Sequence, residues 1–580
     1  MTGKLILLVT SALLVAAGCS IPLQDEQISL RNVCSADSDC PHGSLCTESG
    51  GATLCVATSV DLPEITFEIR PVLGSDASQP SLLSRIDLSS SGGARLLDLD
   101  LEVPPYVDVS PGRVFLPCAA DMAVPAKVTF LPVPGLSGLL ADQLYEADSM
   151  PDDSGGSFAV SVPPGTYDIY IEPEPDLAVT PDCEGSPPIY IPKQAISKDT
   201  GFAVHASAPI TLKGSLKLSQ KEDFTKWFLE VIEPSGGRTI SEVVQPKQDG
   251  IALEVPFSVR FDWTAKDAEE SFVPLIRLRP PPGSGKPIIH WSLDGVPIVS
   301  QTPQELAVTL DVSGVDTQAR PVAGQVFHDS QTVAATVILH SKKIPGSDLN
   351  RFEATVETDA AGRFEALLPR GEYLVIARPH SQSFAIGFTT WDIREGADCF
   401  CGNSVDVPSA TKLTGSVTTP QGQPTEADIR LTPTAAEVEA FLGNTSVSAI
   451  PPRSASAKTE GGQFKATVDA GTFDLSIIPP IDAGYPWLVR PRQEVAVPTT
   501  SSTPVVALQP FALQPPAVVR GVVRGPSGAA LGGATVRAWV GVDDPKSTGA
   551  VPSAVQIGTA VASADGSYVL LLPPSIKQGN

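Results

Sequence analysis

Cysteine is the residue type whose spacing carries most of the recognisable chemistry in this 580-residue chain. Four of the nine cysteines lie close together, in a segment too short to bury a core of its own. They are Cys34, Cys40, Cys46 and Cys55. Gaps of five, five and eight residues differ from the Cys-x₂₋₄-Cys pairs typical of zinc sites. Asp37 and Asp39 lack the other ligands of a calcium loop. We therefore expect two disulfides and no metal, with a pairing that the spacing leaves open.

Four further cysteines form two separate pairs. Cys118 and Cys183 flank one candidate domain and can bridge it. Cys399 and Cys401 are one residue apart, and a disulfide between such neighbours is strained and easily reduced. Redox activity or soft-metal binding is the alternative there, but two thiols without a nearby histidine make a poor metal site. We expect all four cysteines in structural disulfides, as is usual for an even number of cysteines in an exported protein.

The ninth cysteine, Cys19, ends an N-terminal segment with a distinctive composition. Lys4 precedes an apolar run of 13 residues, shorter than the roughly 20 residues of a membrane-spanning helix. The sequence Ala16-Ala17-Gly18-Cys19 resembles the lipobox of bacterial lipoproteins. This resemblance implies a signal peptide over residues 1–18, a lipid on Cys19 and export of the remaining chain. An ordinary secretory signal is the alternative.

The lipobox resemblance also bears on location. Ser20 stands where an aspartate often signals inner-membrane retention in lipoproteins, which favours the outer membrane of a diderm envelope, on its periplasmic or its outer face. The cluster Cys34-x₂-Asp37-x-Asp39-Cys40-x₂-Gly43-x₂-Cys46 resembles small cysteine-rich modules of secreted proteins, including the Dickkopf-type N-terminal module. That second resemblance covers about 25 residues.

The polar residues form none of the common catalytic or cofactor-binding motifs. The six histidines form no His-Glu-x-x-His motif, and no Gly-x-Ser-x-Gly elbow or phosphate-binding loop occurs. We therefore expect no enzyme, no cofactor and no metal. Exposed aromatic side chains can stack on sugar rings, and Trp487 with Tyr485 beside it, in the loop Ala-Gly-Tyr-Pro-Trp, is the best candidate for such a ligand site. Packing in a core or between domains is the alternative.

Composition narrows the classes of partner. The formal net charge of −25, with no cluster of Lys and Arg, argues against nucleic acid and anionic lipid as partners. An apolar fraction of 42% predicts a folded chain. The 56 prolines and 48 glycines indicate many short elements separated by turns. Only three methionines and a body rich in Val, Thr and Ser favour strands over helices.

The body of the chain repeats a pattern of short strands. A Gly-x-Val opening is followed by an Ala-x-Val strand, then Asp-x-x-Gly-x-Phe and Pro-x-Gly-x-Tyr. The opening glycines are Gly112, Gly214, Gly324, Gly415 and Gly521. Their intervals of 102, 110, 91 and 106 residues each suit one sandwich domain. Apolar residues alternate within each copy, as in a strand with one buried face.

This pattern resembles the carboxypeptidase regulatory-like domain, a transthyretin-like (prealbumin-like) β-sandwich. The match is good in the third to fifth copies, moderate in the first and poor in the second. The resemblance implies an all-β protein of tandem Ig-like or prealbumin-like sandwiches after a short disulfide-rich module, and the family supplies no catalytic residue of its own.

The expected division of the chain follows from these features. It is a signal peptide over 1–18, a tether over 19–33, a cysteine-rich module over 34–60, and sandwiches over 61–205, 206–318 (divergent), 319–408, 409–510 and 511–580. The last copy lacks the Gly-x-Tyr strand after Pro573-Pro574. We expect that this sandwich is incomplete or closed differently; an open edge that accepts a strand from a partner is the third option.

The expected function is structural. The sequence predicts a lipid-anchored surface protein of the cell envelope, bound to the membrane through its N-terminal lipid, with sandwiches in a row forming a stalk for adhesion. Its partner would be an envelope protein. A carbohydrate-binding lipoprotein, using Trp487 and Tyr485 on an envelope polysaccharide, is the alternative.

Overall fold

A computed structural model describes residues 32–576, except for short internal gaps. The gaps are 50–51, 73–80, 87–95, 134, 137–138, 141–142, 150–155, 176–177, 179, 199, 233–237, 248–249, 263–274, 282–287, 293–303, 312, 314–319, 344–352, 395–399, 435–451, 496–504 and 544–551. Cys19 and Cys399 therefore lie outside the described residues, as do the signal peptide and nearly all of the tether.

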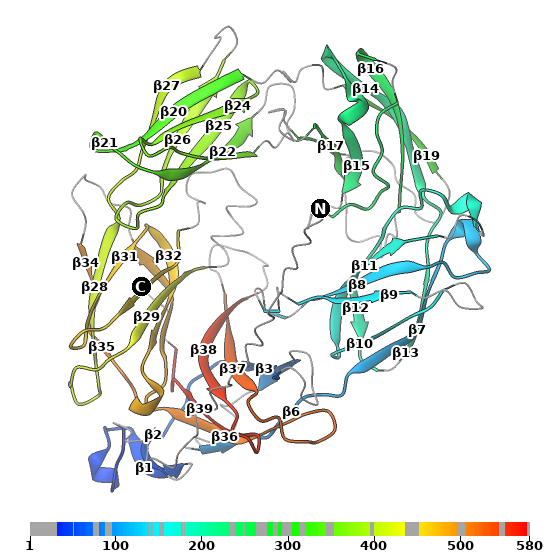
Figure 1. The fold of residues 1–580 in the computed structure, drawn as a ribbon. Helices are drawn as coiled ribbons and strands as arrows, with labels where there is room; N and C mark the ends of the chain where they lie inside the picture. Colours follow the sequence, from blue (N-terminus) through cyan, green and yellow to red (C-terminus); the bar gives the residue numbers. More distant parts are fainter. Residues whose placement is uncertain are drawn as a thin grey trace, which may run out of the picture.

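The predicted all-β class is confirmed. The described residues form one two-stranded sheet near the N-terminus and ten larger sheets, which pack in pairs as five sandwiches (Figure 1). The described helices are single 3₁₀ turns: η1 (Asp37–Asp39), η3 (Pro117–Ala119), η4 (Pro181–Cys183), η5 (Phe224–Lys226) and η7 (Ile481–Ala483). Within the described part of the chain, no helix is long and apolar enough to span a membrane.

The first three sandwiches follow one another along the chain. Sandwich 1 contains β7 (Val107–Phe115), β8 (Ala126–Pro132), β9 (Tyr145–Asp148), β10 (Phe158–Val162), β11 (Gly165–Pro173), β12 (Ile189–Ile196) and β13 (Thr200–His205). Sandwich 2 contains β14 (Ile210–Glu222), β15 (Phe228–Ile232), β16 (Ala252–Phe261), β17 (Leu275–Arg279), β18 (Ile289–Ser292) and β19 (Gln304–Asp311). Sandwich 3 contains β20 (Arg320–His328), β21 (Gln331–Thr332), β22 (Ala335–Lys343), β23 (Glu353–Glu357), β24 (Arg363–Leu368), β25 (Gly371–Pro379), β26 (Gly387–Ile393) and β27 (Phe400–Asp406).

The remaining strands form sandwich 4, sandwich 5 and the cysteine-rich module. Sandwich 4 contains β28 (Thr411–Thr418), β29 (Asp428–Pro433), β30 (Ala455–Lys458), β31 (Gln463–Val468), β32 (Gly471–Ile478), β33 (Leu488–Val495), β34 (Val505–Ala507) and β35 (Phe511–Ala512). Sandwich 5 contains β36 (Ala517–Arg524), β37 (Thr535–Val542), β38 (Ser553–Val561) and β39 (Ser567–Leu572), together with β3 (Ile65–Arg70), β4 (Ser81–Ile86), β5 (Leu96–Asp98) and β6 (Leu101–Glu102). The cysteine-rich module contains β1 (Ser44–Ser49) and β2 (Ala52–Ala57).

The opening strand of each sandwich pairs with its neighbours in a similar way. This strand is β7, β14, β20, β28 or β36. It pairs antiparallel with a strand later in the repeat and parallel with the strand or strands that complete its sheet, and β20 also pairs antiparallel with the short β21. The second strand of the repeat lies in the opposite sheet. The apolar face of each sheet is thereby turned toward its partner sheet, as alternating side chains require.

The repeated glycine of the opening strand has a packing reason. Each one lies directly across the antiparallel ladder from an aromatic residue. The pairs are Gly112 with Phe158, Gly214 with Phe257, Gly324 with Phe364, Gly415 with Phe464, and Gly521 with Tyr568. A Cβ atom on Gly415 would lie 2.5 Å from the ring of Phe464. At Gly112, Gly324 and Gly415 the aromatic ring occupies the space that a side chain would need, whereas at Gly214 and Gly521 the nearest atom is the backbone carbonyl oxygen of Val308 and of Leu99.

The Pro-x-Gly-x-Tyr motif forms the turn that carries the chain from one sheet of the sandwich to the other. In sandwich 3 the Tyr373 hydroxyl donates to the carbonyl of Pro369 over 2.8 Å, and Tyr167 makes the same bond to Pro163 in sandwich 1. Burial raises the pKa of both hydroxyls well above its usual value. Each buried tyrosine thus satisfies its polar atom within its own turn.

The first expected domain boundary is wrong. Residues 61–103 do not join the sandwich that follows them; they pair with the C-terminal strands, and sandwich 1 begins at β7. The last boundary also shifts, because β35 pairs with β28 in sandwich 4 and sandwich 5 resumes at β36. Since one sandwich takes strands from both ends of the chain, the modules do not form an open row. Figure 1 shows them following one another around a ring.

Candidate functional site: a sandwich built from both ends of the chain

Sandwich 5 consists of two parts that are remote in sequence. We call the described residues of 61–103 the donor segment and the described residues of 517–572 the acceptor half. Strand β3 pairs with β37 and β4, just as β32 pairs with β29 and β33 in sandwich 4. Strands β5 and β6 run parallel to β36, as β34 and β35 run parallel to β28. The donor segment therefore supplies the strands that the last sequence repeat lacks.

The two parts share one hydrophobic core. Ile65, Phe67 and Ile69 of β3 are fully buried, and they belong to the same cluster as Val536 and Leu570 of the acceptor half. Alternate residues of β3 point inward, as the period of a strand requires. Burying a large apolar side chain contributes roughly 1.5–3 kcal/mol. The three side chains of β3 alone therefore stabilise the junction of the two parts substantially.

A buried carboxylate on β3 fixes the register of this junction. Glu68 is 1% exposed, and its Oε2 accepts a hydrogen bond of 2.9 Å from Nε1 of Trp539 on β37. Nη1 of Arg537 lies 3.7 Å from the same oxygen, and Arg70 forms an ion pair with Oε1. A buried carboxylate is tolerated only with such partners. A shift of β3 by one residue would turn Glu68 to the other face of the sheet and remove them.

The parallel side of the junction is also polar. Arg520 Nε donates to Oδ1 of Asp98 over 2.6 Å, and the amide of Val522 donates to Oδ1 of Asp100 over 2.9 Å. The hydroxyl of Tyr568 donates to the carbonyl of Leu99 over 2.8 Å. Burial raises the pKa of this tyrosine, with a smaller contribution from the charge of Asp100. Carboxylates of the donor segment thus accept hydrogen bonds from an arginine and a backbone amide of the acceptor half.

Gly521 allows the donor segment to approach this closely. A Cβ atom at this position would lie 2.0 Å from the carbonyl oxygen of Leu99. The opening glycine of the fifth repeat therefore serves both the aromatic pairing described above and the contact with the donor segment. Substitution by any other residue would push the donor backbone away.

The cysteine-rich module packs beside this junction. It contains disulfides between Cys34 and Cys46 and between Cys40 and Cys55, the pairing that the spacing left open. The three sulfurs of Cys34, Cys40 and Cys46 are close enough to suggest a metal group, but all three are in disulfides and provide no free thiolate. Leu54 and Val56 of the module form a small cluster with Val518.

Asn32 ties the start of the described chain to two modules. Its side-chain Nδ2 donates to the carbonyls of Cys55 (3.0 Å) and Gly484 (3.1 Å), and the residue is buried. Gly484 belongs to sandwich 4. Asn32, near the end of the tether, is therefore held where the cysteine-rich module contacts that sandwich. A third disulfide joins Cys118 to Cys183 across 65 residues of sandwich 1. Cys401 is also disulfide-bonded.

The proposed aromatic platform is wrong for Tyr485. This residue is 4% exposed and lies in the core of sandwich 4, where burial raises the pKa of its hydroxyl. The 3₁₀ turn η7 ends at Gly484 in the left-handed region, and the chain then folds back into the core. Trp487 is half-buried against the core of sandwich 5 and lines a hollow of about 60 Å³ with Pro573 and Pro574. The two rings do not form one exposed surface.

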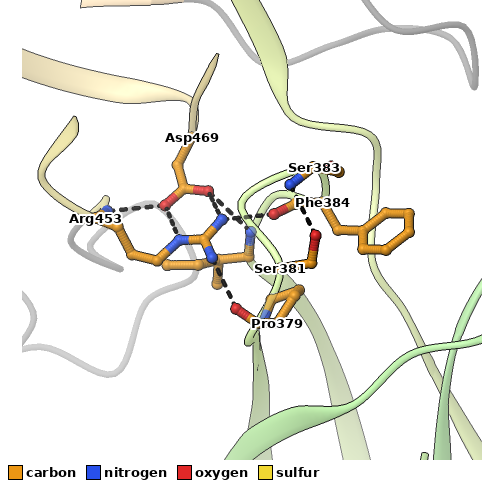
Figure 2. A network of polar contacts seen from close by, with 7 residues as sticks. Pro379, Ser381, Ser383, Phe384, Arg453 and Asp469 are labelled. Carbon is orange, nitrogen blue, oxygen red and sulfur yellow. Dashed lines mark hydrogen bonds and ion pairs between the residues drawn. The ribbon is translucent and has the colours of Figure 1, made fainter. Parts of the chain in front are cut away.

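The contact between sandwiches 3 and 4 depends on one buried ion pair (Figure 2). Arg453 donates from Nε to Oδ2 of Asp469 over 2.9 Å and from Nη2 to Oδ1 over 2.8 Å. The same guanidinium donates to the carbonyls of Pro379 (2.8 Å) and Phe384 (2.5 Å) in sandwich 3. The amide of Ile386 donates to Asp469, which is 3% exposed. The Nη1 and Nη2 atoms of the arginine thus hold sandwich 3 against sandwich 4, while Asp469 of sandwich 4 fixes the guanidinium in place.

The other neighbouring sandwiches are also in contact. The Tyr170 hydroxyl of sandwich 1 donates to the carbonyl of Thr239 in sandwich 2 over 2.6 Å. Sandwiches 2 and 3 share one continuous cluster of buried side chains. Arg492 of sandwich 4 donates to Ser553 of sandwich 5 over 3.2 Å. These contacts define the order of the modules around the ring.

The sequence analysis missed the donor segment, although the sequence contains a signal for it. Residues Thr66-Phe67-Glu68-Ile69 match Thr166-Tyr167-Asp168-Ile169 and Thr472-Phe473-Asp474-Leu475, the hairpin strands of sandwiches 1 and 4. Pro63 also lies four residues before the aromatic residue, as Pro163 does. Ile65 stands where the other copies have glycine, which conceals the motif.

Comparisons with known proteins identify no relative by sequence. No protein-family model and no curated protein matches the chain. Among solved structures, a streptococcal ancillary pilin matches with a TM-score of 0.20 and 10% identity, over 52% of this chain and 98% of that one. The Bacillus anthracis TIE protein matches with a TM-score of 0.15 and 11% identity, over 72% and 73%. The major pilin subunit of Bacillus cereus matches with a TM-score of 0.13 and 8% identity, over 52% of this chain and 99% of that one. Scores this low carry no argument about function.

Proposed function

We propose that this chain is a lipid-anchored protein of the cell envelope with a structural, non-catalytic role, holding protein partners on a closed array of β-sandwiches. The observation that carries the proposal is the shared sandwich 5, which brings both ends of the chain together and fixes the order of the modules. The array replaces the projecting stalk that a row of modules would form.

The position of the anchor supports the proposal. Cys19 precedes Asn32 by 13 residues, and Asn32 is bonded to the cysteine-rich module and to sandwich 4. A lipid on Cys19 would therefore hold this side of the array within a short distance of the membrane, since an extended chain spans about 3.3–3.6 Å per residue. Attachment through several acyl chains at one cysteine is firm.

Charge and surface composition favour a protein partner. The net charge of −25 repels nucleic acid and anionic lipid. Single large apolar side chains are exposed on several sandwiches, among them Leu367 on β24 and Phe388 on β26. The aromatic pair expected to bind polysaccharide does not form a platform, so carbohydrate is left as an outcome of the test.

Membrane attachment is tested first. The native chain and a Cys19→Ser variant are expressed in a diderm host, and the membranes are separated from the soluble fraction. We expect the native chain in the outer-membrane fraction, labelled by a fatty-acid analogue, and the variant unlabelled in the soluble fraction. Equal labelling or equal distribution of the two would contradict lipid anchoring.

Partner binding is tested by photocrosslinking in the envelope. A photoreactive amino acid replaces Leu367 or Phe388, which are exposed, and in a control Phe364, which is buried in the same sandwich. We expect a discrete protein adduct from at least one exposed position and none from the control. Adducts that carbohydrate-degrading enzymes remove would favour a polysaccharide ligand, and absence of any adduct would contradict partner binding by sandwich 3.

A further inference from the structure

The acceptor half is an unfinished sandwich. Its four strands, β36 to β39, leave one edge of β36 and one edge of β37 to be paired by the donor segment alone. Val519, Val536 and Leu570 are buried in the core that the donor segment completes. Without that segment the acceptor half has two open strand edges and an exposed apolar face, which together bind an added strand.

The donor segment is separable from the sandwich that follows it. Within the described residues, β3 pairs with β4 and β37, and β5 and β6 pair with β36. None of these four strands pairs with a strand of sandwich 1. Only residues 104–106 connect the segment to β7, and Pro104 and Pro105 are among them. Prolines restrict such a connection to extended conformations. The segment can therefore change its partner without unfolding sandwich 1.

The junction is specific for this donor sequence. Glu68 requires Trp539 and Arg537, and Asp98 requires Arg520. An unrelated strand would leave these arginines and the indole without their acceptors, which costs free energy in a buried setting. A second copy of the same chain supplies every one of them.

We propose that the donor segment is exchangeable, so that residues 61–103 of one copy complete the acceptor half of a second copy. The contacts formed are the same within one chain and between two. The choice between the two arrangements therefore depends on the effective concentration of the chain's own donor segment compared with the concentration of other chains. Two copies that donate to each other close as a symmetric dimer, whereas donation in one direction makes a head-to-tail contact that extends into an open chain of molecules.

The joints between sandwiches control this choice. A single chain reaches its own acceptor half only if the intervening modules follow the ring, and the Arg453–Asp469 pair holds one of the joints. Loosening that joint lowers the effective concentration of the donor segment within the chain and leaves the junction itself unchanged. We expect exchange to increase as a result.

A disulfide trap tests the proposal on the chain from residue 20 onward, which contains every described residue. Arg70 and Thr535 are cross-strand neighbours between β3 and β37. One preparation carries Arg70→Cys, another carries Thr535→Cys, and they are mixed over a range of concentrations under mild oxidation. We expect a covalent heterodimer whose yield rises with concentration and rises several-fold when both chains also carry Arg453→Ala.

A matched pair controls for random collision. Thr336 and Glu357 are cross-strand neighbours within sandwich 3, and both are contributed by one continuous module. Thr336→Cys mixed with Glu357→Cys should give only background heterodimer. The proposal is overturned if the Arg70/Thr535 mixture gives no more than this background at any concentration. It is equally overturned if the double variant Arg70→Cys/Thr535→Cys forms no crosslink within one chain, since the junction itself would then be absent.

Discussion

The carboxylate of Glu68 accepts a hydrogen bond of 2.9 Å from the indole of Trp539, although the two residues are 471 positions apart in the sequence. The bond joins the first strand of the donor segment to the acceptor half. Glu68 is buried on the face of β3 opposite the core, with Arg537 and Arg70 as its charged partners. Together these contacts hold the two ends of the chain in one register.

Removal of the indole donor should weaken sandwich 5. In Trp539→Phe the carboxylate of Glu68 loses a hydrogen bond while it remains buried, which costs about 1–3 kcal/mol. Urea denaturation followed by hydrogen exchange in residues 535–542 measures the loss. Asp392→Ala is the control, because Asp392 and Arg394 form an exposed ion pair; exposed pairs contribute about 0–1 kcal/mol. Equal losses in both variants would contradict a special role for the Glu68 contact.

The core of the junction should be sensitive to cavity formation. Phe67→Ala removes a fully buried ring and is expected to destabilise sandwich 5 by about 3–5 kcal/mol. Hydrogen exchange should become faster in residues 65–70 and in 535–542 together, since both belong to one core. Phe388→Ala is the control, because Phe388 is exposed. Faster exchange in only one of the two segments would argue against a shared sandwich.

Breaking the ion pair of Figure 2 should loosen the ring. Asp469→Ala leaves the Arg453 guanidinium without its counter-charge, and breaking a buried pair in this way costs about 3–5 kcal/mol. Small-angle scattering should show a larger maximum dimension. Lys458→Ala is the control, because Lys458 and Asp428 form an exposed pair. Unchanged dimensions in Asp469→Ala would mean that other contacts hold the joint.

The opening glycines should tolerate no side chain. In Gly415→Ala the new Cβ would lie 2.5 Å from Phe464, so the ring must move out of its position. Overpacking of this kind costs about 1–3 kcal/mol. Gly201→Ala is the control, because the nearest atom to its Cβ would be 3.8 Å away. Thermal unfolding of the two variants measures the difference, and equal midpoints would contradict the aromatic pairing rule.

Asp474 should make stability depend on pH. Burial raises the pKa of this carboxyl above its ordinary value of 3.8, although the amide and the charge of Arg492 oppose the shift. A raised pKa in the folded state means that its stabilising contribution is complete at low pH and is lost as pH rises through that pKa. Asp474→Asn should therefore gain stability relative to the native chain as the pH rises through the pKa of Asp474 in the folded protein.

A second carboxyl group, that of Asp565, should show the opposite dependence of stability on pH. Hydrogen bonds from the side chain and amide of Ser567 lower the pKa of Asp565. Its contribution is present above the ordinary pKa and lost as pH falls, so Asp565→Asn should lose stability relative to the native chain at neutral pH. Urea unfolding at several pH values checks both signs. Parallel pH profiles for the two variants would show that these carboxyls do not act as described.

The sequence predicted the repeated sandwiches because their signals are local. Gly324 and Phe364, for example, belong to a glycine opening and a Gly-x-Phe strand that recur at domain-sized intervals, and they pair in the structure. The closure of sandwich 5 was missed because it depends on a long-range pairing that no local period reveals. Ile65, in the place of a glycine, also hid the half-repeat in the donor segment.

The position of Tyr485 shows a second limit of sequence reasoning. The loop Ala-Gly-Tyr-Pro-Trp has the composition of an exposed turn, yet the left-handed Gly484 redirects the chain so that Tyr485 enters the core. Such a reversal depends on one backbone dihedral and on the space available in the neighbouring sheets. Residue types alone do not specify either.

The shared sandwich has a consequence for how the molecule matures. Asp98 is synthesised 422 residues before its partner Arg520. At about 5–20 residues per second, the interval is on the order of 20–80 seconds. Strands β3, β5 and β6 therefore remain without their partners β36 and β37 for this interval. A chain whose synthesis stops before β36 leaves the edges of these early strands unpaired, and exposed strand edges are a template for incorrect pairing.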